Sequence, residues 1–141
     1  MFAGIGGFRS GLTKAGGFTC IGYCENDKYA KKAYEAIYDT EGENFYEDAR
    51  TIQPENLPDF DLLCGGFPCQ AFSIAGKRGG FSDSRGTLFF EIARIARVKR
   101  PAFLCLENVP GLLSHDKGRT FQTILVALSE LGYDVAWQVL N

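Results

Sequence analysis

The chain has 141 residues, 45% hydrophobic and 23% charged, which suits one globular domain with a single core. It contains no apolar stretch long enough to cross a membrane and no basic leader, so we expect a cytoplasmic protein rather than a membrane or secreted one. A formal net charge of −2 excludes the uniformly basic surface that marks many nucleic-acid binders, although basic residues gather locally.

Strand-like runs, glycine-containing loops and helix-like periodicity alternate along the chain. Asp27 is a suitable N-cap for the second helix. The expected strands cover residues 1–2, 18–24, 45–46, 61–64, 102–106 and 135–140, and the expected helices cover 6–15, 29–37, 87–98 and 120–131. This alternation predicts an α/β fold with a mostly parallel sheet covered by helices on both faces.

The first and last expected strands look cut. Almost nothing precedes Phe2, and the last strand stops at Asn141. Because strands of a parallel sheet are buried on both faces, missing neighbours would leave apolar surface exposed. We therefore expect a fragment, or one piece of a split protein that needs a C-terminal partner chain.

A glycine-rich turn, residues 2–7, connects the first strand to the first helix. Glycines there allow a tight turn and let a ligand approach the backbone. Twenty-one positions after Gly4 stands Glu25, where an acid can accept hydrogen bonds from ribose hydroxyls. The full G-x-G-x-x-G pattern is absent, which favours a nucleoside without a pyrophosphate. The alternative is that Glu25 only stabilises the start of the next helix.

Asp48, in Asp48-Ala49-Arg50, follows the third strand and could accept a hydrogen bond from an adenine amino group. The alternative is an exposed turn aspartate.

The segment Gly66-Phe67-Pro68-Cys69-Gln70 follows the buried strand at 61–64. Ligands bind beyond the carboxyl ends of strands in open α/β sheets, and Pro68 restricts the backbone there, so Cys69 is a candidate nucleophile. The alternative is a small buried hydrophobic residue. Basic residues follow in the same loop and could meet a phosphate backbone, whereas Arg94 and Arg97 are interpreted as part of a solvated helix face.

Glu107-Asn108-Val109 follows the strand at 102–106. Partial desolvation at a strand end would favour a protonated Glu107, which could donate a hydrogen bond to a ring nitrogen. The alternative is an acid pointing to water. One helix separates this strand from the Cys69 strand, so we expect the two to be neighbours or near-neighbours, whose thiol and acid could face one pocket.

Cysteines and histidine offer little for metal binding. The five cysteines form no C-x-x-C pair, their count is odd, and the single histidine, His115, stands in a polar stretch typical of a solvated loop. The sequence therefore predicts neither a disulfide framework nor a metal.

In this order, the glycine turn, Glu25, Asp48, the Pro-Cys-Gln segment and the Glu-Asn-Val segment closely resemble the DNA (cytosine-5) methyltransferases. The resemblance implies a Rossmann-like S-adenosylmethionine-dependent methyltransferase fold, truncated at both ends. Residues 1–141 would form part of the catalytic domain, with the target-recognition region absent.

The resemblance also implies roles for individual residues. The implied catalytic residues are Cys69 and Glu107. The implied cofactor-binding residues are Phe2, Ala3, Gly4, Gly6, Gly7, Glu25, Asn26, Asp48, Ala49, Gly66, Pro68 and Leu88. The implied DNA contacts are Gln70, Ser73, Lys77, Arg78, Arg85, Asn108 and Val109.

The family's mechanism would then apply to double-stranded DNA with one cytosine flipped out, as base methyltransferases require. The Cys69 thiolate would add to C6, Glu107 would bind the base at N3, and C5 would take the methyl group from S-adenosylmethionine. Loss of the C5 proton and elimination would free Cys69. Restriction-modification is the usual setting for compact members, and we expect little activity from this chain alone.

Three other functions stay open on the sequence. Transfer-RNA cytosine methyltransferases typically carry Pro-Pro-Cys where this chain has Phe67-Pro68-Cys69. An inactive subunit that needs a partner is compatible with the truncation. A nicotinamide-dependent oxidoreductase is suggested only by the glycine turn and Glu25.

Overall fold

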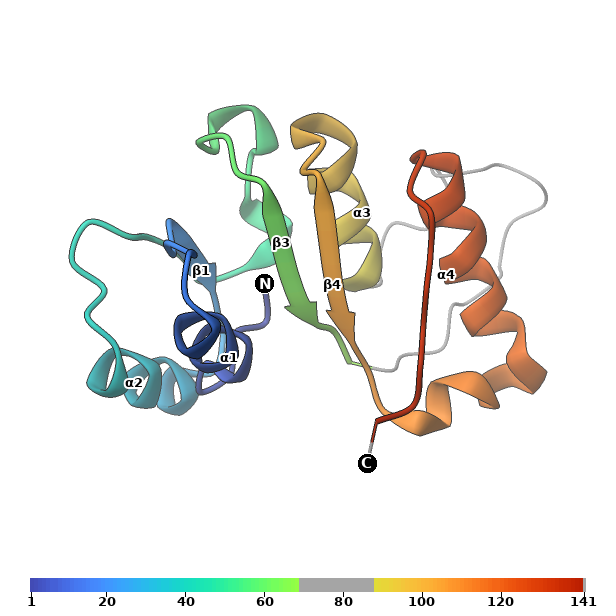
Figure 1. Ribbon diagram of the computed structural model, residues 1–141, viewed down its shortest axis with the longest axis horizontal. Coiled ribbons are helices and arrows are strands. Elements are labelled where there is room, and N and C mark those ends of the chain that lie inside the picture. Colours follow the sequence, from blue (N-terminus) through green and yellow to red (C-terminus); the bar gives the residue numbers. More distant parts are fainter. Residues whose placement is uncertain (69–87, 141) are drawn as a thin grey trace.

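The computed structural model describes residues 1–68 and 88–140 (Figure 1). Helices and strands alternate as the sequence predicts, and the second helix is capped by Asp27, whose carboxylate accepts from the backbone N–H groups of Tyr29 and Ala30 at 2.8 Å. The elements in chain order are α1 (Gly7–Ala15), β1 (Gly22–Cys24), α2 (Lys28–Ile37), β2 (Asn44–Tyr46), β3 (Leu62–Gly66), α3 (Leu88–Lys99), β4 (Phe103–Glu107) and α4 (Arg119–Glu130). No helix of the described ranges combines the length and apolar character needed to cross a bilayer.

The strands form two parallel pairs, β1 with β2 and β3 with β4. Residues 1–3 lie between the pairs (Figure 1) and hydrogen-bond to both. The Met1 amino group donates to the Cys64 carbonyl at 2.7 Å, and the Ala3 N–H donates to the Cys24 carbonyl at 2.9 Å. The expected first strand is thus corrected: residues 1–3 form a connecting segment and no strand, because they make one hydrogen bond to each neighbouring strand and no continuous ladder.

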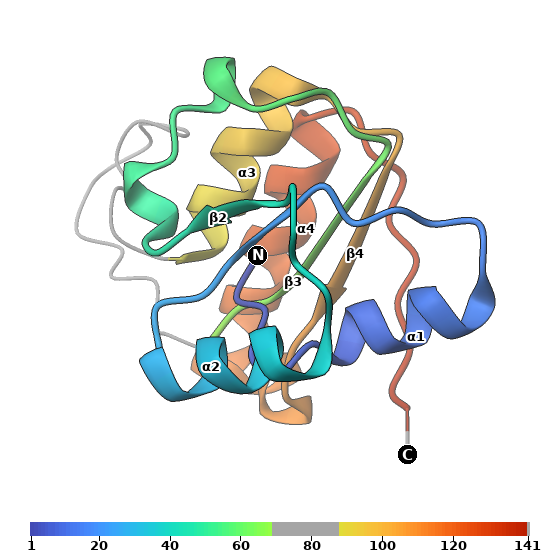
Figure 2. The same ribbon diagram turned by 90° about the vertical axis from the view of Figure 1, so that its left-hand side faces the viewer.

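Helices lie on both sides of the sheet, as predicted, although in the described ranges the β4 residues turned away from α3 and α4 are exposed. Figure 2 shows α3 and α4 on one side of β3 and β4, and α1 on the other. Aromatic and aliphatic side chains of α3 and α4 pack against Leu63, Leu104 and Leu106 to form the larger core. A smaller core joins the two strand pairs, with Ile95 of α3 packed among Cys24, Ala49 and Ile52.

The expected strand at 135–140 is wrong. In the described part of the chain this segment has no strand assignment, and its large apolar side chains, including Trp137, are exposed. Its one ring contact is an edge-on approach of Trp137 to Phe121 of α4, with centroids 5.3 Å apart. A side-chain contact of this kind does not align two backbones for pairing, so the segment stays irregular.

His115 is also less solvated than predicted. It is half-buried, and its Nδ1 lies 2.7 Å from the hydroxyl oxygen of the buried Thr120, the second residue of α4. This contact ties the turn to the helix that follows it.

Candidate cofactor and catalytic site

The glycine turn leaves the centre of the sheet and leads into α1. Phe2, Gly4 and Gly6 have positive φ angles of 54°, 55° and 92°, and the Gly6 N–H closes the turn onto the Ala3 carbonyl at 2.9 Å. Left-handed backbone favours glycine and strains a residue such as Phe2. A Cβ at Gly4 would meet no atom within 4 Å, so the backbone there is open to a ligand.

Glu25 is fixed by the glycine turn. It is 9% exposed, its Oε2 accepts the Gly4 N–H at 2.7 Å, and its Oε1 accepts the Asp27 N–H at 2.8 Å. Each carboxylate oxygen keeps a second acceptor position. An anchored carboxylate beside open glycine backbone is suited to the ribose of a nucleoside, and this contact stays a prediction.

Asp48 caps the short 3₁₀ helix Ala49–Thr51. Its carboxylate accepts from the Arg50 backbone N–H at 2.9 Å and pairs with the Arg50 guanidinium at 2.7 Å. The guanidinium bond, and after it the backbone bond, lower the pKa of Asp48. The acid is therefore held ionised in a defined turn, while a contact with adenine stays a prediction.

Arg94 corrects the expected solvated helix face. Its guanidinium donates to the carbonyls of Ile52 at 2.8 Å and Ala49 at 3.1 Å, and it pairs with Glu91. Arg94 thus supports the turn that carries Asp48 from behind. Arg97 is exposed, as predicted.

The predicted neighbouring strands of the catalytic pair are confirmed. β3 and β4 pair in parallel with Gly66 opposite Glu107. A Cβ at Gly66 would come within 3.0 Å of the Glu107 Oε2, so glycine makes room for this carboxylate.

Glu107 is exposed rather than partly desolvated. Along β4, Leu104 and Leu106 are partly buried against α3 and α4, and the alternate residues, including Glu107, lie on the uncovered face. The expected desolvation therefore has no basis in this structure.

Asn108 anchors the segment that leads to Cys69. Its Nδ2 donates to the Phe67 carbonyl at 2.6 Å, and its Oδ1 accepts the Val109 N–H at 2.9 Å. The Phe67 ring is buried against Phe89, with centroids 5.3 Å apart. The backbone two residues before the predicted nucleophile is thus fixed by a hydrogen bond and by core packing.

The remaining site residues divide by whether the structure describes them. Asn26, Pro68 and Val109 are exposed and Leu88 opens α3. The predictions for Cys69, Gln70, Ser73, Lys77, Arg78 and Arg85 fall outside the described residues. Among the described members, Glu25 and Asn26 follow β1, Asp48 and Ala49 follow β2, Gly66 ends β3 and Glu107 ends β4. No three His, Cys, Asp or Glu side chains of the described ranges form a potential metal site.

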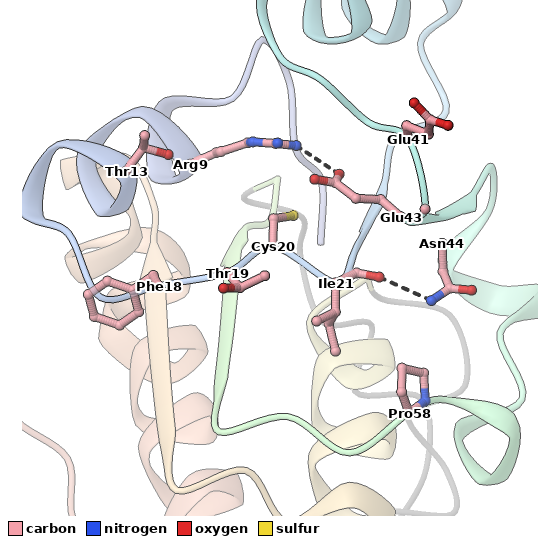
Figure 3. A pocket seen from close by; sticks show the side chains of 11 residues that line it. Arg9, Thr13, Phe18, Thr19, Cys20, Ile21, Glu41, Glu43, Asn44 and Pro58 are labelled. Atoms are coloured by element: carbon pink, nitrogen blue, oxygen red, sulfur yellow. Dashed lines mark hydrogen bonds and ion pairs between the residues drawn. The ribbon is translucent and has the colours of Figure 1, made fainter.

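A groove of about 660 Å³ lies elsewhere, at the amino ends of β1 and β2 (Figure 3). Its lining includes Arg9, Cys20, Ile21, Glu43 and Asn44, none of which is a predicted site residue. The chemistry-bearing residues therefore occupy the opposite, carboxyl edge of these strands.

Comparisons with known proteins agree with this geometry. A family model described as C-5 cytosine-specific DNA methylase matches residues 1–141. The chain is 51% identical to the type II methyltransferase M.NgoBI of Neisseria gonorrhoeae, over all of this chain and 43% of that protein. It is 48% identical to the type II methyltransferase M.HhaI of Haemophilus parahaemolyticus, over all of this chain and 42% of that protein. The chain thus spans about two fifths of the length of these relatives.

Solved structures share the fold. A protein described as a DNA modification methyltransferase encoded in an E. coli prophage aligns with 92% of this chain and 36% of its own, with a TM-score of 0.68 and 27% identity. A mutant of DNMT2 from Spodoptera frugiperda aligns with 92% of this chain and 39% of its own, with a TM-score of 0.67. At 19% identity, the second likeness concerns the fold alone.

Proposed function

Because the chain belongs to the C-5 cytosine-specific DNA methylase family, we propose that it is the cofactor-binding and nucleophile-bearing part of an enzyme that methylates C5 of cytosine in double-stranded DNA. Two observations support this proposal: Glu25 is anchored by the Gly4 and Asp27 N–H groups just after β1, and Glu107 stands opposite Gly66 where β3 and β4 end. Residues 1–3 hydrogen-bond to both strand pairs and so connect these two positions. The target-recognition region, and a partner chain if the protein is split, lie outside these residues in this proposal.

The cofactor proposed for this edge is S-adenosylmethionine, which supplies an electrophilic methyl group when bound. Glu25 accepts the ribose hydroxyls through its free acceptor positions, and the open backbone at Gly4 allows close approach. Asp48 accepts from the adenine amino group. The other proposed cofactor residues, Phe2, Ala3, Gly6, Gly7, Asn26, Ala49, Gly66, Pro68 and Leu88, flank these three positions in the chain.

Cys69 and Glu107 carry the proposed chemistry on the cytosine. The Cys69 thiolate forms a bond to C6 of the flipped base, which moves an electron pair to C5. Glu107 binds the N3 edge and stabilises the charge that develops on the ring. After C5 is methylated, loss of its proton to a base drives elimination, which breaks the bond from sulfur to C6.

The first experiment tests the cofactor side. We expect S-adenosylhomocysteine to bind the chain one to one in calorimetry, and Glu25→Ala to weaken binding at least about tenfold because two charge-assisted hydrogen bonds are lost. Glu47→Ala is the matched control, since Glu47 is an exposed acid close in sequence to Asp48. If the folded chain does not bind S-adenosylhomocysteine, these 141 residues by themselves do not form the cofactor site.

The second experiment tests the assigned nucleophile, Cys69, by an assay that detects a single turnover. A DNA duplex with 5-fluorocytosine cannot lose a C5 proton, so attack by Cys69 leaves a covalent adduct that survives denaturation. We expect slow adduct formation in the presence of S-adenosylmethionine, and none with Cys69→Ser. An adduct of equal yield with Cys69→Ser would contradict the assigned nucleophile.

A further inference from the structure

Tyr38 reaches the glycine turn from the end of α2. Its hydroxyl donates to the Gly6 carbonyl at 2.8 Å. The same carbonyl accepts the Ser10 N–H, the first hydrogen bond of α1, also at 2.8 Å. Both lone pairs of this oxygen are therefore used, one to start the helix and one to bind Tyr38.

The Tyr38 ring also occupies the space beside Gly6. A Cβ on Gly6 would clash with the Tyr38 ring, and Gly6 is buried with φ at 92°. Glycine is thus required at this position for two reasons, its backbone conformation and the closeness of the ring.

Arg9 holds the Tyr38 ring from the other side. Its guanidinium lies 4.6 Å from the centroid of that ring and donates at 2.7 Å to the Glu43 carboxylate and to the Asp39 carbonyl. Figure 3 shows the bond from Arg9 to Glu43. The two side chains are only 17% and 8% exposed, so this pair is shielded from solvent. A guanidinium that lies over the ring and donates to two separate acceptors leaves the ring little freedom.

We propose that Tyr38, held by Arg9, is a positioning residue that keeps the glycine turn in the form in which Gly4 reaches Glu25. The consequence for the cofactor rests on the proposed function, whereas the consequence for the turn does not. Without the Tyr38 hydroxyl, the turn spends more time in other conformations. Apparent cofactor affinity then falls in proportion to the remaining competent fraction.

Tyr38→Phe tests this proposal, because it removes the hydroxyl and keeps the ring. Tyr133→Phe is the matched control, since the Tyr133 hydroxyl donates to the Pro101 carbonyl at the same distance of 2.8 Å and, within the described residues, makes no hydrogen bond to the glycine turn. In the free chain we expect Tyr38→Phe to speed hydrogen exchange at the Gly4 and Gly6 amides about fivefold, the factor that one neutral hydrogen bond contributes. S-adenosylhomocysteine affinity should fall by a similar factor, and Tyr133→Phe should change neither.

The outcomes separate this proposal from the proposed function. Unchanged exchange at Gly4 and Gly6 in Tyr38→Phe, or an equal rise in Tyr133→Phe, would overturn the positioning role. Faster exchange in a chain that does not bind S-adenosylhomocysteine would support the positioning role and count against the cofactor. If Tyr38→Phe does not fold, Arg9→Lys is tested in its place, because lysine keeps the positive charge but lacks the planar guanidinium that stacks on the Tyr38 ring. Unchanged hydrogen exchange at Gly4 and Gly6 in Arg9→Lys would equally overturn the proposal.

Discussion

Different interactions stabilise the N-terminal half of the chain (residues 1–56) and the C-terminal half (57–68 and 88–140). In the N-terminal half no residue of α1 is buried, and its position is fixed by bonds that Arg9 and Tyr38 donate and by the Gly4 N–H bond that Glu25 accepts in the preceding turn. In the C-terminal half, Phe89 and Ile92 are at most 1% exposed and belong to one apolar core. Directional bonds therefore position α1 and the glycine turn, whereas burial of apolar area holds α3 against β3 and β4.

The two halves meet at α3. Ile95 enters the smaller core with Ala49 and Ile52, and Arg94 binds the carbonyls of those same two residues. A change on this helix can therefore reach the turn that carries Asp48, although the helix belongs to the C-terminal half.

The largest expected effect comes from Ile92→Ala, because Ile92 is 0% exposed in the apolar core. Removing its side chain leaves a cavity and should lower the free energy of unfolding by about 2–5 kcal/mol in urea titrations. Val98→Ala on the same helix is the control, since Val98 is 42% exposed. If the two variants lower the free energy of unfolding equally, burial of apolar side chains does not stabilise the C-terminal half, and the contrast between the two halves fails.

Much of this fold follows from local patterns. Apolar periodicity predicts α1, α2, α3 and α4, and the alternation of strands with helices predicts that β3 and β4 are neighbours. The expected strands at 1–2 and 135–140 are wrong because a strand needs a continuous ladder of hydrogen bonds, which an apolar run does not reveal. Residues 1–3 make one bond to each of two neighbouring strands and no ladder, and 135–140 has no strand assignment.

The site divides in the same way. A strand followed by Glu25, and another followed by Glu107, could be recognised because residue type and position were enough. The bonds from Asn108 to Phe67, Arg94 to Ile52 and Tyr38 to Gly6 join residues 41, 42 and 32 positions apart. Such a bond leaves no periodic signal in either segment, so the supporting role of these side chains was not predicted, although Asn108 itself is a predicted DNA contact.

An intermediate effect is expected from Asn108→Ala, which removes the bond to the Phe67 carbonyl. The free energy of unfolding should fall by about 1 kcal/mol, the usual net value of one hydrogen bond. Because this bond fixes the backbone before Cys69, the rate of adduct formation with 5-fluorocytosine DNA should fall as well.

Asn44→Ala is the matched control for Asn108→Ala. The Asn44 side-chain amide donates to the Ile21 carbonyl at 3.0 Å, at the opposite edge of the sheet. A similar loss of stability with an unchanged adduct rate is expected. If both variants slow the adduct equally, the Asn108 bond has no specific part in positioning the Cys69 segment, and the C-terminal half depends on apolar packing alone.

The smallest effect concerns two exposed ion pairs of the same kind, one in each half. The Arg50 guanidinium bond lowers the pKa of Asp48, and the Arg119 guanidinium bond lowers the pKa of Asp116. A carboxyl group whose pKa is lowered by folding stabilises the fold at every pH above the pKa that the group has in the unfolded chain. This stability is lost as the pH falls through the group's pKa in the folded chain. Because all four groups are at least partly exposed and screened by salt, each ion pair contributes little to the free energy of unfolding.

Carboxyl titration by NMR resolves each pair directly. Arg50→Gln should raise the pKa of Asp48 toward its ordinary value and leave Asp116 unchanged, and Arg119→Gln should do the reverse. Adding S-adenosylhomocysteine should then perturb the Asp48 titration alone, since only Asp48 belongs to the proposed cofactor edge. An equal response of Asp116 to the ligand would mean that the ligand acts through a general change of the fold. The N-terminal half would then not be the half that responds to the cofactor.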